Sequence, residues 1–210
     1  MAYGYLGQNT PNQTVNNSGV FSITDSADLE SQGSLGGSLE LIEEQTYSSA
    51  VSFVDFTSIQ ENKYDVHFMT FNNVDYASEQ VPALRFYESG VLESAGVYQY
   101  AEQQCQSNGS FAESKDTAST FLGLGNFAVG ASNVYCYLYN LGNSSKYSFI
   151  SFHNVNTDAD ASPSEAVADF GGGVLPQAST VDGIRFTGAG GANFSSFNIK
   201  LYGVKQIWVT

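Results

Sequence analysis

Positive charge is scarce in this chain of 210 residues. Only 7 residues are Lys or Arg, against 21 Asp and Glu, and the formal net charge is −14. A protein that binds duplex nucleic acid has to neutralise several phosphates with Lys and Arg, and the same side chains draw a protein to an anionic membrane surface. The sequence therefore predicts no nucleic-acid partner and no attachment to an acidic membrane.

Cysteine and long apolar runs are also scarce. Cys105 and Cys136 show neither metal-binding nor redox spacing, so we expect two unpaired thiols. No run approaches the ~18 apolar residues of a membrane span. The first residues lack the basic and apolar regions of a signal peptide. We therefore expect no membrane insertion, and synthesis in a cytoplasm.

Apolar residues, by contrast, make up 42% of the chain, and from residue 38 onward they alternate with polar ones. The alternating segments are 39–43, 51–56, 64–68, 84–87, 97–101, 134–139, 147–152, 184–186 and 197–202. Gly, Asn, Ser or Pro separates them, without helical stretches between. This pattern predicts an all-β, antiparallel sandwich or barrel. The longest irregular connection is expected at 154–173.

The N-terminal part has a different composition and shows no period. It is rich in Asn, Gln and Gly, which is typical of an extended arm. Ser22 or Thr24 is a suitable cap for one short helix, which Gly33 would end. The sequence therefore predicts two parts, an N-terminal docking arm with a short helix at 1–37 and a β-sandwich domain at 38–210.

Residues suited to catalysis are few. The only histidines are His67 and His153, and neither lies near a nucleophile elbow, so we expect both to be ordinary sheet histidines. Glu40 with its acidic neighbours, or Glu88 with Glu93, would offer the paired carboxylates of a glycosidase. An acidic surface that keeps the protein soluble explains these groups as well. The sequence predicts no catalytic residue.

One loop carries oxygen ligands at alternate positions. Asp158, Asp160 and Ser162 alternate, with Asp169 further on, and hard cations bind such oxygens. The common calcium loop needs Gly where this chain has Pro163. We expect a solvated acidic loop, no metal and no cofactor.

Two glycine runs, 171–173 and 188–191, have the composition of phosphate-binding loops but lack the Lys-Ser/Thr that would follow. We expect tight turns or close backbone approaches at these places.

Tyrosine is the most informative residue type. Tyr135, Tyr137 and Tyr139 share one face of a predicted strand, and Tyr98 and Tyr100 share a face of another. Such tyrosines occur in sandwich cores or packed on a sheet. They also occur in protein interfaces, where they bury area at low entropic cost, and in platforms that bind sugars. All three interpretations stay open.

A set of segments resembles the virion proteins of tailed bacteriophages, notably marine ones. They are Gly-Val-Phe-Ser-Ile-Thr-Asp at 19–25, Gly-Gly-Ser-Leu-Glu-Leu-Ile-Glu at 36–43, Val-Asp-Phe-Thr-Ser-Ile at 54–59, Tyr-Asp-Val-His-Phe at 64–68, Arg-Phe-Tyr-Glu-Ser-Gly at 85–90, Ser-Thr-Val-Asp-Gly-Ile-Arg-Phe at 179–186 and Ile-Lys-Leu-Tyr-Gly-Val-Lys at 199–205. The resemblance runs in order over about 19–205 and is specific as a set.

The resemblance implies a jelly-roll-like body and a short segment that docks to the particle. It implies a non-enzymatic accessory fibre or decoration protein on the tail or capsid, located in the virion and bound to other virion proteins. Its self-association would be trimeric, as in fibres. The residues expected at an interface or glycan platform are Tyr3, Tyr5, Tyr135, Tyr137 and Tyr139. The alternatives are a carbohydrate-binding module for a host-surface glycan and a depolymerase.

Overall fold

The computed structural model describes residues 38–125, 132–158 and 165–205. This part of the chain is built from strands joined by turns and loops, so the predicted all-β class is confirmed. Within these ranges no helix is long and apolar enough to span a membrane. The arm and the short helix that the sequence predicts at 1–37 lie outside the described residues.

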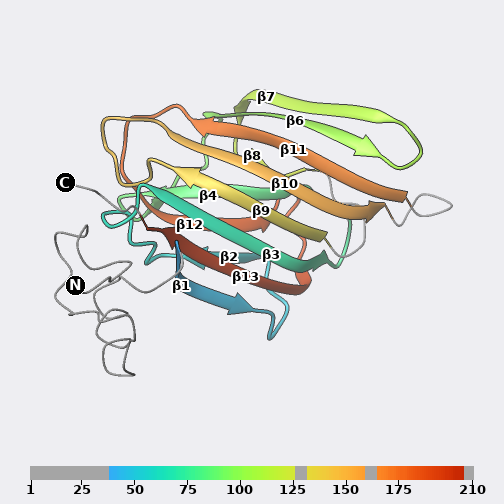
Figure 1. Cartoon of the computed structure of the whole chain (residues 1–210), viewed down its shortest axis with the longest axis horizontal. Coiled ribbons are helices and arrows are strands. Elements are labelled where there is room, and N and C mark those ends of the chain that lie inside the picture. Colours follow the sequence, from blue (N-terminus) through green and yellow to red (C-terminus); the bar gives the residue numbers. More distant parts are fainter. Residues whose placement is uncertain (1–37, 126–131, 159–164, 206–210) are drawn as a thin grey trace, which may run out of the picture. The chain divides into compact units, whose positions relative to one another are not determined.

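The strands form two antiparallel sheets (Figure 1). Their bounds are β1 (Leu39–Thr46), β2 (Phe53–Phe56), β3 (Val66–Tyr76), β4 (Pro82–Glu88), β5 (Val91–Leu92), β6 (Tyr98–Gln106), β7 (Phe111–Ser119), β8 (Leu122–Gly123), β9 (Ser132–Tyr139), β10 (Ser148–Asp158), β11 (Glu165–Leu175), β12 (Val181–Gly188) and β13 (Phe194–Val204). The larger sheet has eight strands in the order β1-β13-β3-β9-β10-β11-β6-β7. The smaller sheet has the order β2-β12-β4-β5, and β8 also pairs with β4.

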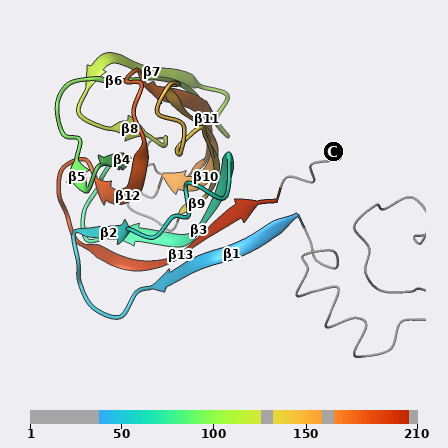
Figure 2. The ribbon, with the colours of Figure 1, turned by 90° about the vertical axis from the view of Figure 1, so that its left-hand side faces the viewer.

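The two sheets face each other and enclose the apolar core (Figure 2). Phe71 of the larger sheet lies against Phe186 of the smaller one, with ring centroids 4.6 Å apart. Phe186 in turn stacks on Phe194 of β13 at 5.3 Å. All three are almost completely buried, and burying a side chain of this size contributes roughly 1.5–3 kcal/mol. The predicted sandwich is confirmed.

Alternation in the sequence predicted strands and their faces well. Every alternating segment overlaps a strand. In β9, Val134, Cys136 and Leu138 are buried, whereas Tyr135 and Tyr137 are exposed, as the parity predicted. Tyr98 and Tyr100 also share a face, and that face is turned to the core: Tyr98 is fully buried and Tyr100 packs against the core.

The prediction of a long irregular connection at 154–173 is wrong. Residues from Asn154 to Asp158 continue β10, and β11 begins at Glu165 and pairs with β10 along its whole length. Alternation is hidden in β11 because its outward positions include Ala166 and Ala168, and an acidic residue occupies one of its inward positions.

Strand β7 was also missed, since eight of its nine residues are exposed and no apolar period forms.

The two glycine runs serve different purposes. The run at 188–191 is a turn after β12, closed by a hydrogen bond from the Gly191 N–H to the Gly188 carbonyl, as expected. The run at 171–173 is not a turn but the middle of β11. A Cβ on Gly171 would lie 2.4 Å from the carbonyl oxygen of Ala101 on β6, so close approach between strands requires glycine there.

Candidate interaction face

Aromatic side chains cover the outer face of the eight-stranded sheet, the side turned away from the smaller sheet. We call this set the aromatic face. Its members are Phe68, Tyr135, Tyr137, Tyr139, Phe149, His153, Phe170 and Tyr202. Strand register brings them together, because Phe68 is opposite both Tyr137 and Tyr202, and His153 is opposite Tyr135 on one side and Phe170 on the other.

Contacts between the rings make the aromatic face continuous across five strands. Phe68 lies 4.8 Å from Tyr137 and 6.1 Å from Tyr202, measured between ring centroids. Tyr135 stacks on the His153 imidazole at 5.3 Å, and His153 lies 6.0 Å from Phe170. These rings remain partly open to solvent, with 43% of both Tyr135 and Phe170 exposed. They form a supported but uncovered surface.

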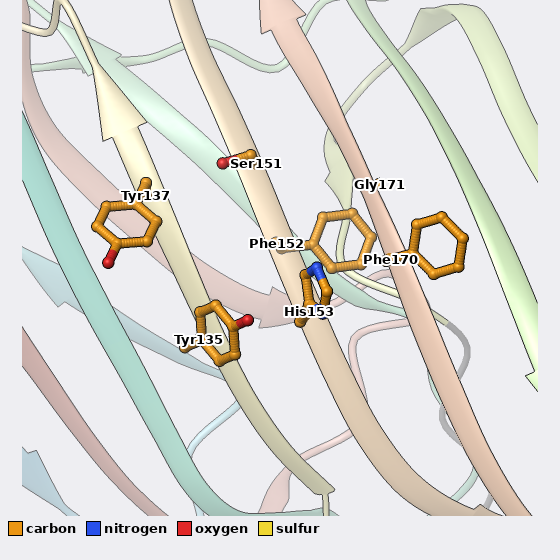
Figure 3. A pocket seen from close by; sticks show the side chains of 7 residues that line it. All are labelled: Tyr135, Tyr137, Ser151, Phe152, His153, Phe170 and Gly171. Atoms are coloured by element: carbon orange, nitrogen blue, oxygen red, sulfur yellow. The ribbon is translucent and has the colours of Figure 1, made fainter.

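A shallow depression of about 310 Å³ lies in this face (Figure 3). Tyr135 and Tyr137 line one side, Phe170 and Gly171 the other, and His153 lies between them. Ser151 adds a hydroxyl, and its Oγ lies 3.2 Å from the Tyr139 hydroxyl. The depression therefore offers flat rings together with a few hydrogen-bonding groups.

Charge is missing from the centre of the outer face, although the protein is strongly acidic. The outward positions carry no Asp, Glu, Lys or Arg over 66–72 of β3, 133–139 of β9, 149–157 of β10, 166–174 of β11 and 99–105 of β6. Lys200 on β13 borders this area on one side, and Glu113 and Lys115 on β7 border it on the other. Covering such a face requires no ion to be desolvated.

Three of the five expected interface residues lie together in the aromatic face, and the structure does not describe the other two. Tyr135, Tyr137 and Tyr139 all point away from the core, so the interpretation of these tyrosines as core residues is wrong. Tyr3 and Tyr5 lie outside the described residues. Sequence reasoning missed the contributions of β3, β10, β11 and β13, because the alternation of a strand does not reveal its neighbours.

The two histidines have different surroundings. His153 belongs to the aromatic face. His67 is completely buried, and its Nε2 lies 2.8 Å from the carbonyl oxygen of Ile59. Burial lowers the pKa of His67 below its usual value, because the charged imidazolium loses solvation. His67 is therefore a neutral structural side chain at neutral pH.

A cluster of polar side chains also lies inside the sandwich, beneath β6, β10 and β11. The amide nitrogens of Asn154 and Asn156 each lie 3.3 Å from the same carboxylate oxygen of Asp169. The Gly125 N–H donates to the Glu102 carboxylate at 2.9 Å. Burial above all, and the nearby Asp169 charge, raise the pKa of Glu102 to about 7.

This cluster corrects the expected acidic loop. Asp169 is an inward residue of β11, 2% exposed, rather than part of a solvated loop. Asp158 ends β10, while Asp160 and Ser162 lie outside the described residues. The parity of β6 gave a usable signal for Glu102, which shares the inward positions with Tyr98 and Tyr100. Among the described residues, no group of three or more His, Cys, Asp or Glu is placed to hold a metal ion.

The other carboxylates that sequence analysis singled out make ordinary surface contacts. Glu40 forms ion pairs with Lys63 at 2.6 Å and with Lys205 at 3.7 Å. Glu88 accepts a hydrogen bond from the Ser179 hydroxyl. These contacts explain the groups as parts of the sheet surface.

Comparison of the chain with protein-family models, curated proteins and solved structures found no match. The aromatic face is therefore interpreted from its own geometry and chemistry.

Proposed function

We propose that the protein is a non-enzymatic structural component of a tailed bacteriophage particle, an accessory fibre or decoration protein that associates through its aromatic face. The observation that carries the association is the continuous, uncharged set of rings across β13, β3, β9, β10 and β11. Apolar patches of this kind on a soluble protein usually mark an interaction site. The particle itself is proposed from the sequence resemblance.

Strand order supports a jelly roll within the larger fold. In chain order, β1, β3, β9 and β13 lie in one sheet, and β2, β4, β8 and β12 lie in the other. The orders β1-β13-β3-β9 and β2-β12-β4-β8 are those of two interlocked Greek keys. Strands β5–β7 and β10–β11 are then insertions, and β10, β11, β6 and β7 widen the first sheet. Jelly rolls build viral capsid and lectin domains, which fits a structural or a binding role.

Light scattering of the purified full chain tests the association. We expect an oligomer with a mass of three times the 22.5 kDa of one chain, or six times where trimers also pair through a second contact. Tyr137→Lys places a charge in the centre of the face and should weaken association by at least about tenfold, as at an interface hot spot. Val91→Lys on β5 is the matched control, since Val91 is 70% exposed and lies on the other sheet. A monomeric wild type at micromolar concentration contradicts self-association.

A role in the particle is tested separately. Mass spectrometry of purified phage particles should detect the chain at constant stoichiometry, and labelling it in intact particles by imaging should locate it. A chain that stays in the lysate while the particles are complete contradicts the structural role.

A carbohydrate-binding module is the second candidate, and the depression beside Tyr135, His153 and Phe170 favours it. Flat rings with a few hydroxyl groups suit the apolar faces and hydroxyls of sugars. Glycan-array binding by the wild type that Tyr135→Ala and Phe170→Ala both abolish, in a protein that remains monomeric, would favour this function over the first.

A further inference from the structure

Strand β7 is an open edge of the eight-stranded sheet. It pairs with β6 on one side, and no strand in the described part of the chain pairs with its other side (Figure 1). Eight of its nine residues, Phe111 to Ala118, are exposed, and Phe111 is 71% exposed. Free N–H and C=O groups on such an edge are a template for another strand.

The hydrogen bonding in the hairpin of β6 and β7 identifies the main-chain groups of β7 that point to the open edge. The Gln106 N–H donates to the Ser110 carbonyl at 3.0 Å, so these opposite residues form a hydrogen-bonded pair. Hydrogen-bonded and non-bonded pairs alternate along an antiparallel ladder. Ala112 and Ser114 are thus bonded to β6, and the backbone groups of Glu113 and Lys115 point to the open edge.

The charge pattern of β7 can pair with a second copy of itself. Glu113 and Lys115 lie on one face of the strand, with the Lys115 Nζ 2.6 Å from the Glu113 Oε1, and both side chains are exposed. If two β7 strands meet antiparallel around a two-fold axis at Ser114, Glu113 of each chain faces Lys115 of the other. The four charges then alternate in sign. In the same register, the edge-facing backbone groups of Glu113 in one chain lie opposite those of Lys115 in the other, as hydrogen bonding between the strands requires.

Neighbouring registers are unfavourable. A shift of the axis to Glu113 places two carboxylates opposite each other, and a shift to Lys115 places two ammonium groups opposite each other. Like charges directly opposite on adjacent strands are destabilising. The charges therefore oppose these two registers, and within β7 only the axis at Ser114 places unlike charges directly opposite each other.

We propose that β7 pairs with β7 of a second copy of this chain, antiparallel about a two-fold axis at Ser114, so that the two larger sheets become one continuous sheet. This contact is separate from the aromatic face. It joins copies in pairs, whether each copy is single or already part of a larger assembly.

A cysteine cross-link tests the register in the full chain with Cys105 replaced by serine. Residues in a non-hydrogen-bonded antiparallel pair have Cα atoms about 4.5 Å apart, within the range of a disulfide. Ser114→Cys should therefore link two chains under mild oxidation. Ala112→Cys is the control, because its two copies would be four residues apart along the strands, about 13 Å, and should not link.

Charge exchange supplies an independent test. Glu113→Lys alone or Lys115→Glu alone places like charges opposite each other, and each should weaken the pairing about tenfold or more. The double variant, Glu113→Lys with Lys115→Glu, restores opposite charges and should return to within about threefold of the wild-type dissociation constant. Sedimentation measures all four proteins.

Three outcomes would overturn the proposal: no cross-link through residue 114, a cross-link through 112 instead, or single charge variants that associate like the wild type. Tyr137→Lys serves as the reference for the other surface. If it disrupts the oligomer while β7 variants do not, the edge contact fails and the function of the aromatic face survives.

Discussion

The free energy of unfolding should fall as the pH rises from 5 to 8, and Glu102→Gln should remove most of that fall. The folded protein holds the Glu102 proton with a pKa of about 7, against an ordinary value of 4.5. Because the pKa is raised on folding, the stabilisation is complete below about pH 4.5 and is lost as the pH rises through 7. The pKa shift of Glu102 can change the free energy of unfolding by at most about 3 kcal/mol. Because Glu102 is partly exposed, we expect a change of about 1–2 kcal/mol.

The comparison between variant and wild type at each pH isolates this carboxyl. His67 acts in the opposite direction, because its pKa is lowered on folding: its contribution is present above pH 6.5 and is lost as the pH falls through the folded value. His67 is present in both proteins, so its effect cancels. Glutamine keeps an acceptor for the Gly125 N–H. We expect Glu102→Gln to be more stable than the wild type at pH 8 and to equal it near pH 4, where Glu102 is protonated in both the folded and the unfolded state.

Urea denaturation at several pH values measures the difference, and Glu79→Gln is the control. Glu79 is exposed, so this substitution removes one negative charge without changing the interior. If Glu79→Gln alters the pH dependence as much as Glu102→Gln does, overall charge repulsion causes it, and the buried carboxyl does not.

The outward position of the tyrosines on β9 could be predicted from sequence, whereas the face that they build could not. Alternation fixes which residues of one strand are buried, and it did so for Val134, Cys136 and Leu138. The aromatic face, however, needs Phe68 and Tyr202 beside Tyr137. Those rings meet because β13, β3 and β9 are neighbours in the sheet, and the order of strands is a property of the whole chain.

The buried carboxyl groups also could not be brought together from sequence, because their contact depends on which strands are neighbours. Glu102 and Asp169 lie far apart in sequence and approach each other only because β6 pairs with β11. Without that pairing, Asp169 was grouped with the nearby acidic residues of its own segment. Strand β7 was missed for a different reason. A strand with no buried face has no apolar period, so the pattern that identifies other strands is absent from it.

The glycine at position 173 is expected to be essential for the pairing of β11 with β6. A Cβ there would lie 2.7 Å from the carbonyl oxygen of Gln99 and 2.6 Å from a methyl group of Leu122, so the backbone of β6 would have to move. Gly173→Ala should lower the free energy of unfolding by about 1–3 kcal/mol, the usual cost of overpacking, and Gly173→Val by more. Strand propensity alone would predict the opposite sign, since both replacements favour a strand over glycine.

Ala168→Val is the matched control for this prediction. Ala168 lies on the same strand with its side chain exposed on the outer face, so the added methyl groups meet solvent and the change should stay within about 0.5 kcal/mol. Denaturation of the three variants and the wild type in urea gives the comparison. If Gly173→Val is as stable as Ala168→Val, then β11 and β6 are not held as closely at Gly173 as the structure places them.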